Sequence, residues 1–244
     1  MSDTQHPVGL VKLSGTITRY TCQRADASFF FTESDDMKIG VVAVAAALAG
    51  VSGPAIATAS YASAEEPADY LEFELEGEPV KGWVWRSPFK DGDAVDVAAE
   101  WQDDHYEIAA VARPADGIIA LYPHCSRGTV RHVKNALKWW FWGSIAFNIF
   151  FIAFLTLLFS FSTRPLKSAE IPTHLIVSGT LSAVFALMTF SLARRWMPFV
   201  RLTERICQVL DFPNPGNIDL VKSSKLLRKP EDDGAYGHLY FRYR

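Results

Sequence analysis

Two long runs without any Asp, Glu, Lys or Arg limit what this chain can fold into more than any other feature. They cover Trp139–Thr163 and Ile171–Ala193. At the helical rise of about 1.5 Å per residue, roughly 20 apolar residues cross the core of a bilayer, so each run is long enough to span one. We therefore predict two transmembrane helices, at 137–163 and 171–196, joined as a hairpin by a short polar link. The alternative is a buried helical hairpin inside a soluble protein.

The borders of both runs carry the residue types that gather where a membrane meets water. Tryptophan rings favour this interface, and arginine marks helix ends outside the hydrocarbon core. The residues that we predict at the interface are Trp139, Trp140, Trp142, Arg194, Arg195 and Trp196. Positive charge is concentrated on the outer flanks of the pair rather than on the connecting link, which predicts that both termini lie in the cytoplasm. The polar, partly acidic leader also lacks the pattern of a secretory signal.

A few polar and small residues inside the runs predict how the two helices pack. Asn148 is the strongly polar side chain of the first run, and in lipid such a group tends to face another helix. Gly179 and Ser182 belong to a stripe of small residues in the second run, which allows a close helix approach. We expect these three residues at helix contacts, with a tolerated polar residue as the alternative for Asn148.

A third uncharged stretch, Ile39–Ala64, differs in kind because Ala, Gly, Ser and Thr dominate it. Gly53-Pro54 interrupts it, and proline disfavours helix at the residue before it. Since strand-like segments lie on both sides, a single crossing would split one sheet across the membrane. We therefore favour a helical hairpin at 37–66, with a true span as the alternative. Small residues recur there at four-residue spacing, which suits intramolecular helix packing or self-association: Ala43 with Ala47, and Ala46 with Gly50.

The remaining polar sequence predicts a small β domain built from 1–36 and 67–128. Leu71, Phe73 and Leu75 alternate with glutamates, the signature of a half-buried strand, and Glu78-Pro79 marks the turn before its return. The segments predicted as strands are Val8–Tyr20 (a pair or one long bent strand), Ser28–Thr32, Asp69–Arg86, Ala94–Trp101, Tyr106–Arg113 and Gly117–Tyr122. Short strands at close spacing favour a small barrel or sandwich with an OB-like pattern. The predicted fold class is an α+β membrane protein, whose cytoplasmic tail, 197–244, packs back on the β domain through helices and a final strand.

The segment Tyr122–Gly128 contains the strongest candidates for chemistry, His124 and Cys125. A nucleophilic cysteine needs a positive neighbour that lowers its pKa, and His124 or Arg127 offers one. The alternative, which we favour, is a turn that joins the last strand to the membrane helix, with Arg127 meeting lipid headgroups. A metal site from His105 and Cys22 lacks the spacing of metal ligands. With no phosphate-binding, hydrolase or dinucleotide motif, we expect no cofactor and do not predict an enzyme.

Charge and cysteine content exclude other classes. The formal net charge is −3, which argues against a general nucleic-acid binder. The three cysteines are far apart and odd in number, so they form no disulfide framework.

Several phrases together resemble a group of proteobacterial membrane proteins labelled as type VI secretion system effectors: SGTITRYTCQRADASFFFTESD, PVKGWVWRSPFKDGD, AVARPADGIIALYPHCSRG and NIDLVKSSKLLRKPEDDGAYGHLYFRYR. The resemblance covers nearly the whole chain and implies a multi-pass protein of the bacterial inner membrane that acts in competition between bacteria. As an effector it would permeabilise a target membrane. As an immunity or accessory protein it would bind a secretion component or a toxin. The alternatives are a membrane-anchored adaptor, self-association, or a membrane-anchored cysteine-dependent enzyme.

Overall fold

The computed structural model describes residues 9–27, 66–160 and 171–243. They form two compact units, one from the chain before Val130 together with Pro198–Arg244, and one from Val130–Met197. Of the predicted segments, Ser28–Thr32 and the stretch with Ala43, Ala46, Ala47 and Gly50 lie outside the described residues.

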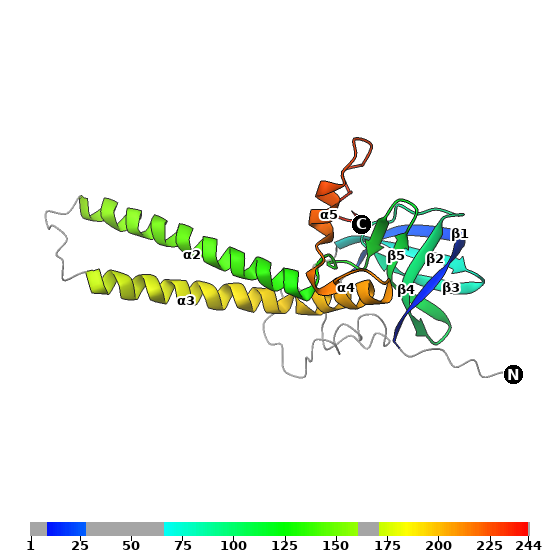
Figure 1. Ribbon diagram of the computed structural model, residues 1–244, viewed down its shortest axis with the longest axis horizontal. Helices are drawn as coiled ribbons and strands as arrows, with labels where there is room; N and C mark the ends of the chain where they lie inside the picture. Colours follow the sequence, from blue (N-terminus) through cyan, green and yellow to red (C-terminus); the bar gives the residue numbers. More distant parts are fainter. Residues whose placement is uncertain (1–8, 28–65, 161–170, 244) are drawn as a thin grey trace. The chain divides into compact units, whose positions relative to one another are not determined.

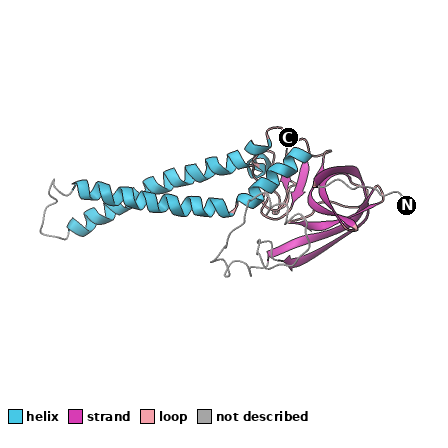
Figure 2. Ribbon diagram, turned by 90° about the horizontal axis from the view of Figure 1, so that it is seen from below, coloured by secondary structure: helices cyan, strands magenta, loops and turns pink. Residues whose placement is uncertain are grey.

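The first unit contains a closed β-barrel, whose strands are magenta in Figure 2. Its five strands follow the order β3-β2-β1-β4-β5, with β3 also paired to β5. Its strands are β1 (Leu10–Ala27), β2 (Glu66–Leu75), β3 (Glu78–Val84), β4 (Ala94–Gln102) and β5 (His105–Arg113). The β3–β5 pairing that closes the barrel is parallel, and the other pairings are antiparallel. This arrangement is OB-like. The strands β6 (Ile118–Leu121) and β7 (Phe241–Arg242) extend the sheet beyond β5.

Strand β1 serves both halves of the barrel because it bends. Its first half pairs with β4 from Leu10 to Thr16, and its second half pairs with β2 from Ile17 onward. The register shifts between Thr18 and Thr21, where Arg19 has a φ of 54°, a value typical of an irregularity in a strand. One long bent strand was among the predictions for Val8–Tyr20, and the strand continues to Ala27.

The alternation predicted for β2 is confirmed, since Leu71, Phe73 and Leu75 are buried in the barrel core. The predicted turn at Glu78-Pro79 is wrong. The chain turns two residues earlier, at Glu76 and Gly77, whose φ values of 51° and 90° are both positive. A two-residue hairpin loop with two positive φ values matches the twist of the flanking strands. Pro79 instead lies near the start of β3, opposite Glu74.

Closure of the barrel depends on Gly82 in β3. Its φ is 148°, and a Cβ at this position would lie 2.8 Å from the backbone nitrogen of Ile108 on β5. Only glycine therefore lets β3 approach β5 closely enough to pair with it.

The tail after the second long helix belongs to the barrel unit from Pro198 onward. It contains α4 (Met197–Val209), a 3₁₀ turn at Pro215–Asn217, α5 (Leu220–Leu226) and β7. The Asp219 side chain caps α5 by accepting a hydrogen bond from the Lys222 amide. An ion pair between Arg242 and Asp232 ties the end of the tail, with both side chains at least nine-tenths buried.

The second unit is a pair of antiparallel helices, α2 (Thr129–Ser160) and α3 (Ile171–Arg195), which lie side by side in Figure 1. Both are long and apolar enough to cross a membrane. In the most apolar window within Thr129–Phe154 only 6% of the residues are buried, and in that within Ile176–Arg195 none is. The core helix of a soluble protein would be mostly buried.

Candidate functional site

The segment between β6 and α2 is fixed by backbone hydrogen bonds to the tail. The Gly128 amide donates to the Ile218 carbonyl at 3.0 Å, and the Leu220 amide donates to the Ser126 carbonyl at 3.0 Å. A Cβ on Gly128 would lie 2.1 Å from the Pro215 carbonyl oxygen, so the close approach requires glycine. Arg127 Nε lies 3.4 Å from Asp219 Oδ1, within the same unit.

The Cys125 thiol in this segment is not placed for nucleophilic chemistry. It is fully buried, and its Sγ lies 3.5 Å from the Phe199 carbonyl oxygen of α4. Burial raises the pKa of the thiol to about 12, so the thiol is protonated at neutral pH. Reactive cysteines are thiolates in partly exposed, electropositive surroundings.

The side chain of the neighbouring His124 contacts two aromatic rings and a carboxylate. Its backbone has a φ of 67°, and its ring stands edge-on to Trp85 and to Phe199, with ring centroids 5.1 Å apart in both cases. Its Nε2 lies 3.5 Å from Glu66 Oε2. Burial lowers the pKa of His124, and the Glu66 carboxylate opposes this shift. Through these contacts, His124 and Cys125 pack the turn after β6 against the barrel and against α4. The segment is therefore better described as a structural turn than as a catalytic site.

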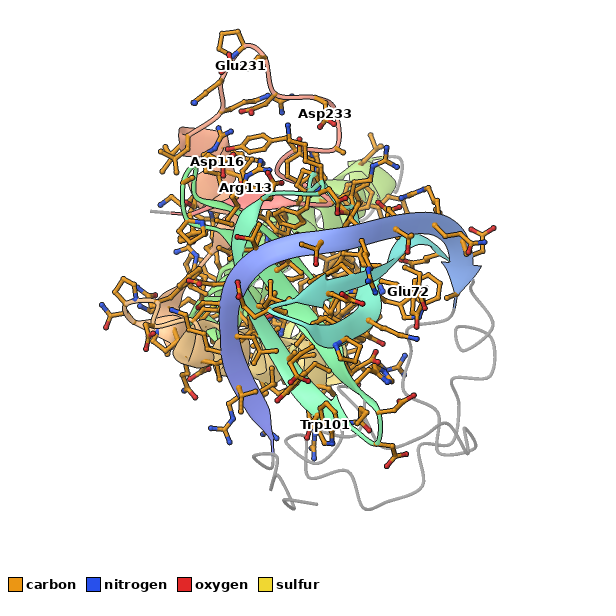
Figure 3. All side chains as sticks on the ribbon, turned by 90° about the vertical axis from the view of Figure 1, so that its right-hand side faces the viewer. Glu72, Trp101, Arg113, Asp116, Glu231 and Asp233 are labelled. Atoms are coloured by element: carbon orange, nitrogen blue, oxygen red, sulfur yellow. The ribbon has the colours of Figure 1, made fainter. Side chains whose placement is uncertain are left out.

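The described residues contain no group of three or more His, Cys, Asp or Glu side chains that could hold a metal ion. The barrel carries a different functional candidate on its outer surface, which we call the acidic face: Tyr70, Glu72, Lys81, Trp83, Glu100, His105 and Glu107. Strand pairing builds it. Glu72 lies opposite Lys81, Lys81 opposite Glu107, and Glu107 opposite Glu100, so one row of charges crosses four strands. Figure 3 labels Glu72 on this side of the barrel and Arg113 with Asp116 at another.

Aromatic side chains flank this row. Tyr70 and Trp83 are cross-strand neighbours with ring centroids 5.0 Å apart, and both are half-buried. Burial, followed by the charges of Glu107 and Glu72, raises the pKa of Tyr70. Half-exposed Tyr and Trp side chains are the residue types that dominate protein interfaces.

Two carboxylates share the ring of His105 at the edge of the acidic face. The Nδ1 atom lies 2.7 Å from Asp104 Oδ1, and the Nε2 atom lies 3.3 Å from Glu107 Oε2. Burial raises the pKa of Glu107, and the hydrogen bond to His105 opposes this shift. Lys81 meets Glu72 at 3.4 Å. The row therefore holds more negative than positive charge.

The same excess marks the whole barrel region. Between Gly9 and Ala27 and between Glu66 and Gly128, fifteen residues are acidic and eight are basic. Sequence reasoning missed the acidic face because its members come from four strands. The alternating glutamates of β2 indicate an exposed side, but they do not reveal which strands continue it.

The helical hairpin contains a cluster of polar side chains between its two helices. The Asn148 amide donates to the Ser144 carbonyl at 2.7 Å and to the Ser182 hydroxyl at 3.0 Å. The Ser178 hydroxyl donates to the Asn148 side-chain oxygen. Asn148 and Ser182 thus meet across the helices. Gly179 is different, because a Cβ there would meet nothing within 4 Å.

The side chains predicted at the membrane interface divide into two groups. Trp139 and Trp142 are 70% and 58% exposed, and Arg194 and Arg195 are exposed as well. Trp140 instead points across the hairpin, where its indole N–H donates to the Ser182 carbonyl at 3.4 Å. Trp196 is half-buried at the end of the second unit.

In comparisons with known proteins, no protein-family model, no curated protein and no solved structure matches the chain.

Proposed function

We propose that this chain is an integral membrane protein that presents an OB-like barrel in the cytoplasm, where the barrel binds a basic segment of a protein partner. The observation that carries the proposal is the exposure of the two long apolar helices. Phe150, Leu187 and Ile176 are 67%, 73% and 69% exposed. Such a contiguous apolar surface is stable only against lipid or another apolar surface.

The charge distribution supports the cytoplasmic placement. Basic residues flank the hairpin on its two outer ends, and short loops rich in Lys and Arg stay on the cytoplasmic side. These residues are Arg127, Arg131, Lys134, Lys138, Arg194, Arg195 and Arg201. The bacterial inner membrane, with two crossings and both termini in the cytoplasm, is the location that fits this pattern.

The partner's charge follows from the acidic face. A segment that carries Lys or Arg would complement Glu72, Glu100 and Glu107, while Tyr70 and Trp83 supply apolar contact area. The acidic surface also argues against a nucleic acid as partner, because phosphates would be repelled.

The type VI secretion context rests on the resemblance of the sequence phrases. Within it, the hairpin favours a resident immunity or accessory protein over a pore-forming effector. The polar groups of Asn148, Ser178 and Ser182 bond to one another, and the exposed Thr156 and Thr180 hydroxyls donate to carbonyls of their own helices. Within the described residues of the hairpin, these side chains therefore bond inside the helix pair rather than forming a polar stripe that could line a pore.

Two measurements test the proposal. Membranes from expressing cells should retain the protein after alkaline carbonate extraction and release it with detergent; release by carbonate alone would overturn the membrane assignment. Expression in a susceptible bacterium should leave the membrane potential intact and protect against a toxin encoded nearby. Rapid depolarisation on induction would instead support the effector.

A matched pair of variants tests the binding face. Trp83→Ala removes an aromatic side chain from the acidic face, whereas Trp139→Ala removes an exposed one from the hairpin. Affinity capture in mild detergent should lose the partner with Trp83→Ala and retain it with Trp139→Ala. The same partner captured at wild-type yield by Trp83→Ala would exclude this face as the binding surface.

A further inference from the structure

A groove runs along the hairpin, below its positively charged end. It has a volume of about 360 Å³, near the lower end of the roughly 300–1,000 Å³ of small-molecule sites. Its walls are almost entirely apolar. The lining residues are Trp140, Phe141, Ser144, Ile145, Asn148, Ile149, Ile152 and Ser182.

The apolar stripe of this groove continues into two lysines. Lys134, Lys138, Phe141, Ile145 and Ile152 recur along α2 at spacings of three, four or seven residues, which places them on one side of the helix. At the rise of about 1.5 Å per residue, Lys138 lies about 4.5 Å above Phe141 along the helix axis, and Lys134 about 10 Å above it. The lysine side chains therefore reach the level of phosphate groups when the apolar stripe is in hydrocarbon.

Among the described residues, these two lysines have no counter-charge. Both are exposed, and neither makes an ion pair or hydrogen bond within the described part of the chain. The exposed rings of Trp139 and Trp142 lie next to Lys138 along α2, and such rings favour the interface between hydrocarbon and headgroups. A ligand for this stripe has an anionic head next to an apolar chain.

One polar atom in the groove also lacks a partner. The Ser144 hydroxyl is buried, with the residue 9% exposed, and it has no hydrogen-bond partner among the described residues. It lies one helical turn below Trp140. The ester carbonyl of a phospholipid lies between phosphate and hydrocarbon, so it is an acceptor of suitable depth for this hydroxyl.

We propose that the groove binds one anionic phospholipid, with an acyl chain along Phe141, Ile145 and Ile149 and the phosphate against Lys134 and Lys138. This inference rests on the membrane insertion proposed above. A second copy of the chain is a poorer occupant, because two copies that share this stripe would bring their lysines together. Basic clusters at the cytoplasmic end of membrane helices are a recurrent site for anionic headgroups.

The test uses the full-length protein in a neutral detergent. Native mass spectrometry during titration with phosphatidylglycerol should show one saturable lipid, bound more tightly than phosphatidylcholine. The double variant Lys134→Gln/Lys138→Gln should weaken phosphatidylglycerol binding about 10- to 30-fold and leave phosphatidylcholine unchanged. The control, Lys222→Gln/Lys225→Gln, removes the same charge from exposed positions of α5 and should bind like the wild type.

A groove-filling variant tests the apolar half of the site. Ile149→Trp should reduce the binding of both lipids while the helical circular dichroism stays unchanged. Equal affinity for the two lipids, or unchanged phosphatidylglycerol binding in the lysine double variant, would overturn the inference. Failure of the membrane proposal looks different, since the wild type would then be monodisperse without detergent.

Discussion

The barrel and the hairpin treat their apolar side chains in opposite ways. In the barrel, Ile17, Leu71 and Ile108 are 0% exposed, and charged side chains cover the outside. In the hairpin, Trp139 and Leu187 are 70% and 73% exposed, and the polar side chains of Asn148 and Ser182 face inward. The barrel buries apolar side chains, whereas the hairpin encloses polar ones. The proposed membrane insertion accounts for this difference, because it places the barrel in water and the hairpin in lipid.

The largest expected effect is on barrel closure. Gly82→Val places a β-branched side chain at a φ of 148° and within 2.8 Å of the Ile108 backbone. Backbone strain of about 1–3 kcal/mol and overpacking of about 1–3 kcal/mol should together lower the free energy of unfolding of the barrel by about 2–6 kcal/mol. Urea unfolding followed by tryptophan fluorescence measures this change.

Gly234→Val is the control for this substitution, because a Cβ there meets nothing within 4 Å. It should leave the midpoint nearly unchanged. In both variants the helical signal of the hairpin in detergent should persist, since the hairpin forms a separate unit. A concerted loss of barrel and hairpin in Gly82→Val would contradict the division into two units.

The second prediction concerns the ion pair inside the tail, which ties the loop after α5 to β7, the strand that pairs with β6. Asp232 accepts two hydrogen bonds from Arg242, at 2.9 and 3.0 Å, with both side chains largely buried. Asp232→Asn leaves the guanidinium without its counter-charge and should cost about 3 kcal/mol. Glu231→Gln is the control, because Glu231 is exposed and meets Lys229 at only 3.9 Å. Limited proteolysis should cut the tail faster in Asp232→Asn; equal rates would contradict a tethering role.

The pH dependence of this tether has a definite sign. Burial alone would raise the pKa of Asp232, but the hydrogen bonds and charge of Arg242 outweigh burial and lower it. A carboxyl group whose pKa is lower in the folded state stabilises the fold above its unfolded pKa, near 3.8. That contribution is lost as the pH falls through the folded pKa. Release of the tail should therefore require strongly acidic conditions in the wild type.

The two regions also differ in how far their sequence predicts their structure. The strands and the two long helices could be predicted because each reflects a local pattern, such as the alternation at Leu71, Phe73 and Leu75. The choice between a closed barrel and a sandwich could not be predicted, since closure depends on the close approach of Gly82 to Ile108, which no local pattern encodes. The hairpin turn at Glu76 and Gly77 was missed because Pro79 is the stronger turn signal in the sequence.

The candidate sites show the same limit. His124 and Cys125 are adjacent in the sequence, yet they do not act on one another: the His124 ring contacts Phe199 and Glu66, whereas the buried Cys125 thiol contacts the Phe199 carbonyl oxygen. The acidic face unites Glu72, Lys81 and Glu107 through pairings between distant strands. Adjacency along a chain thus predicted chemistry poorly, whereas strand register determined which charges meet.

The third prediction concerns the inward polar contacts of the hairpin. Asn148→Leu removes the bonds to Ser178 and Ser182 and should destabilise the helix pair by about 0.6–2 kcal/mol, the range for such bonds in membranes. Unfolding in mixed micelles of mild and denaturing detergent measures it. The control is Thr156→Val, whose hydroxyl bonds only to the Ile152 carbonyl of its own helix at 2.8 Å. An equal loss in both variants would show that Asn148 contributes no specific contact between the helices.

The smallest expected effect is a stabilisation rather than a loss of stability, and it tests how charge contributes to the stability of the barrel. Glu100 lies opposite Glu107, and burial raises its pKa. A carboxyl group with a raised folded pKa stabilises the fold most below its unfolded pKa, near 4.5, and loses that contribution as the pH rises through the folded pKa. Glu100→Gln should therefore stabilise the barrel at pH 7 by about 0.2–1 kcal/mol, because it removes a like-charge cross-strand pair.

This gain should disappear in acid, where Glu100 is protonated in the wild type as well. The control, Glu72→Gln, breaks an exposed pair with Lys81 and should be neutral or slightly destabilising at pH 7. The apolar part of the hairpin carries no Asp, Glu, Lys or Arg. Its unfolding in micelles should therefore not respond to Glu100→Gln at any pH. Stabilisation of the barrel at low pH as well as at pH 7 would mean that Gln packs better than Glu, and that charge repulsion is not the cause.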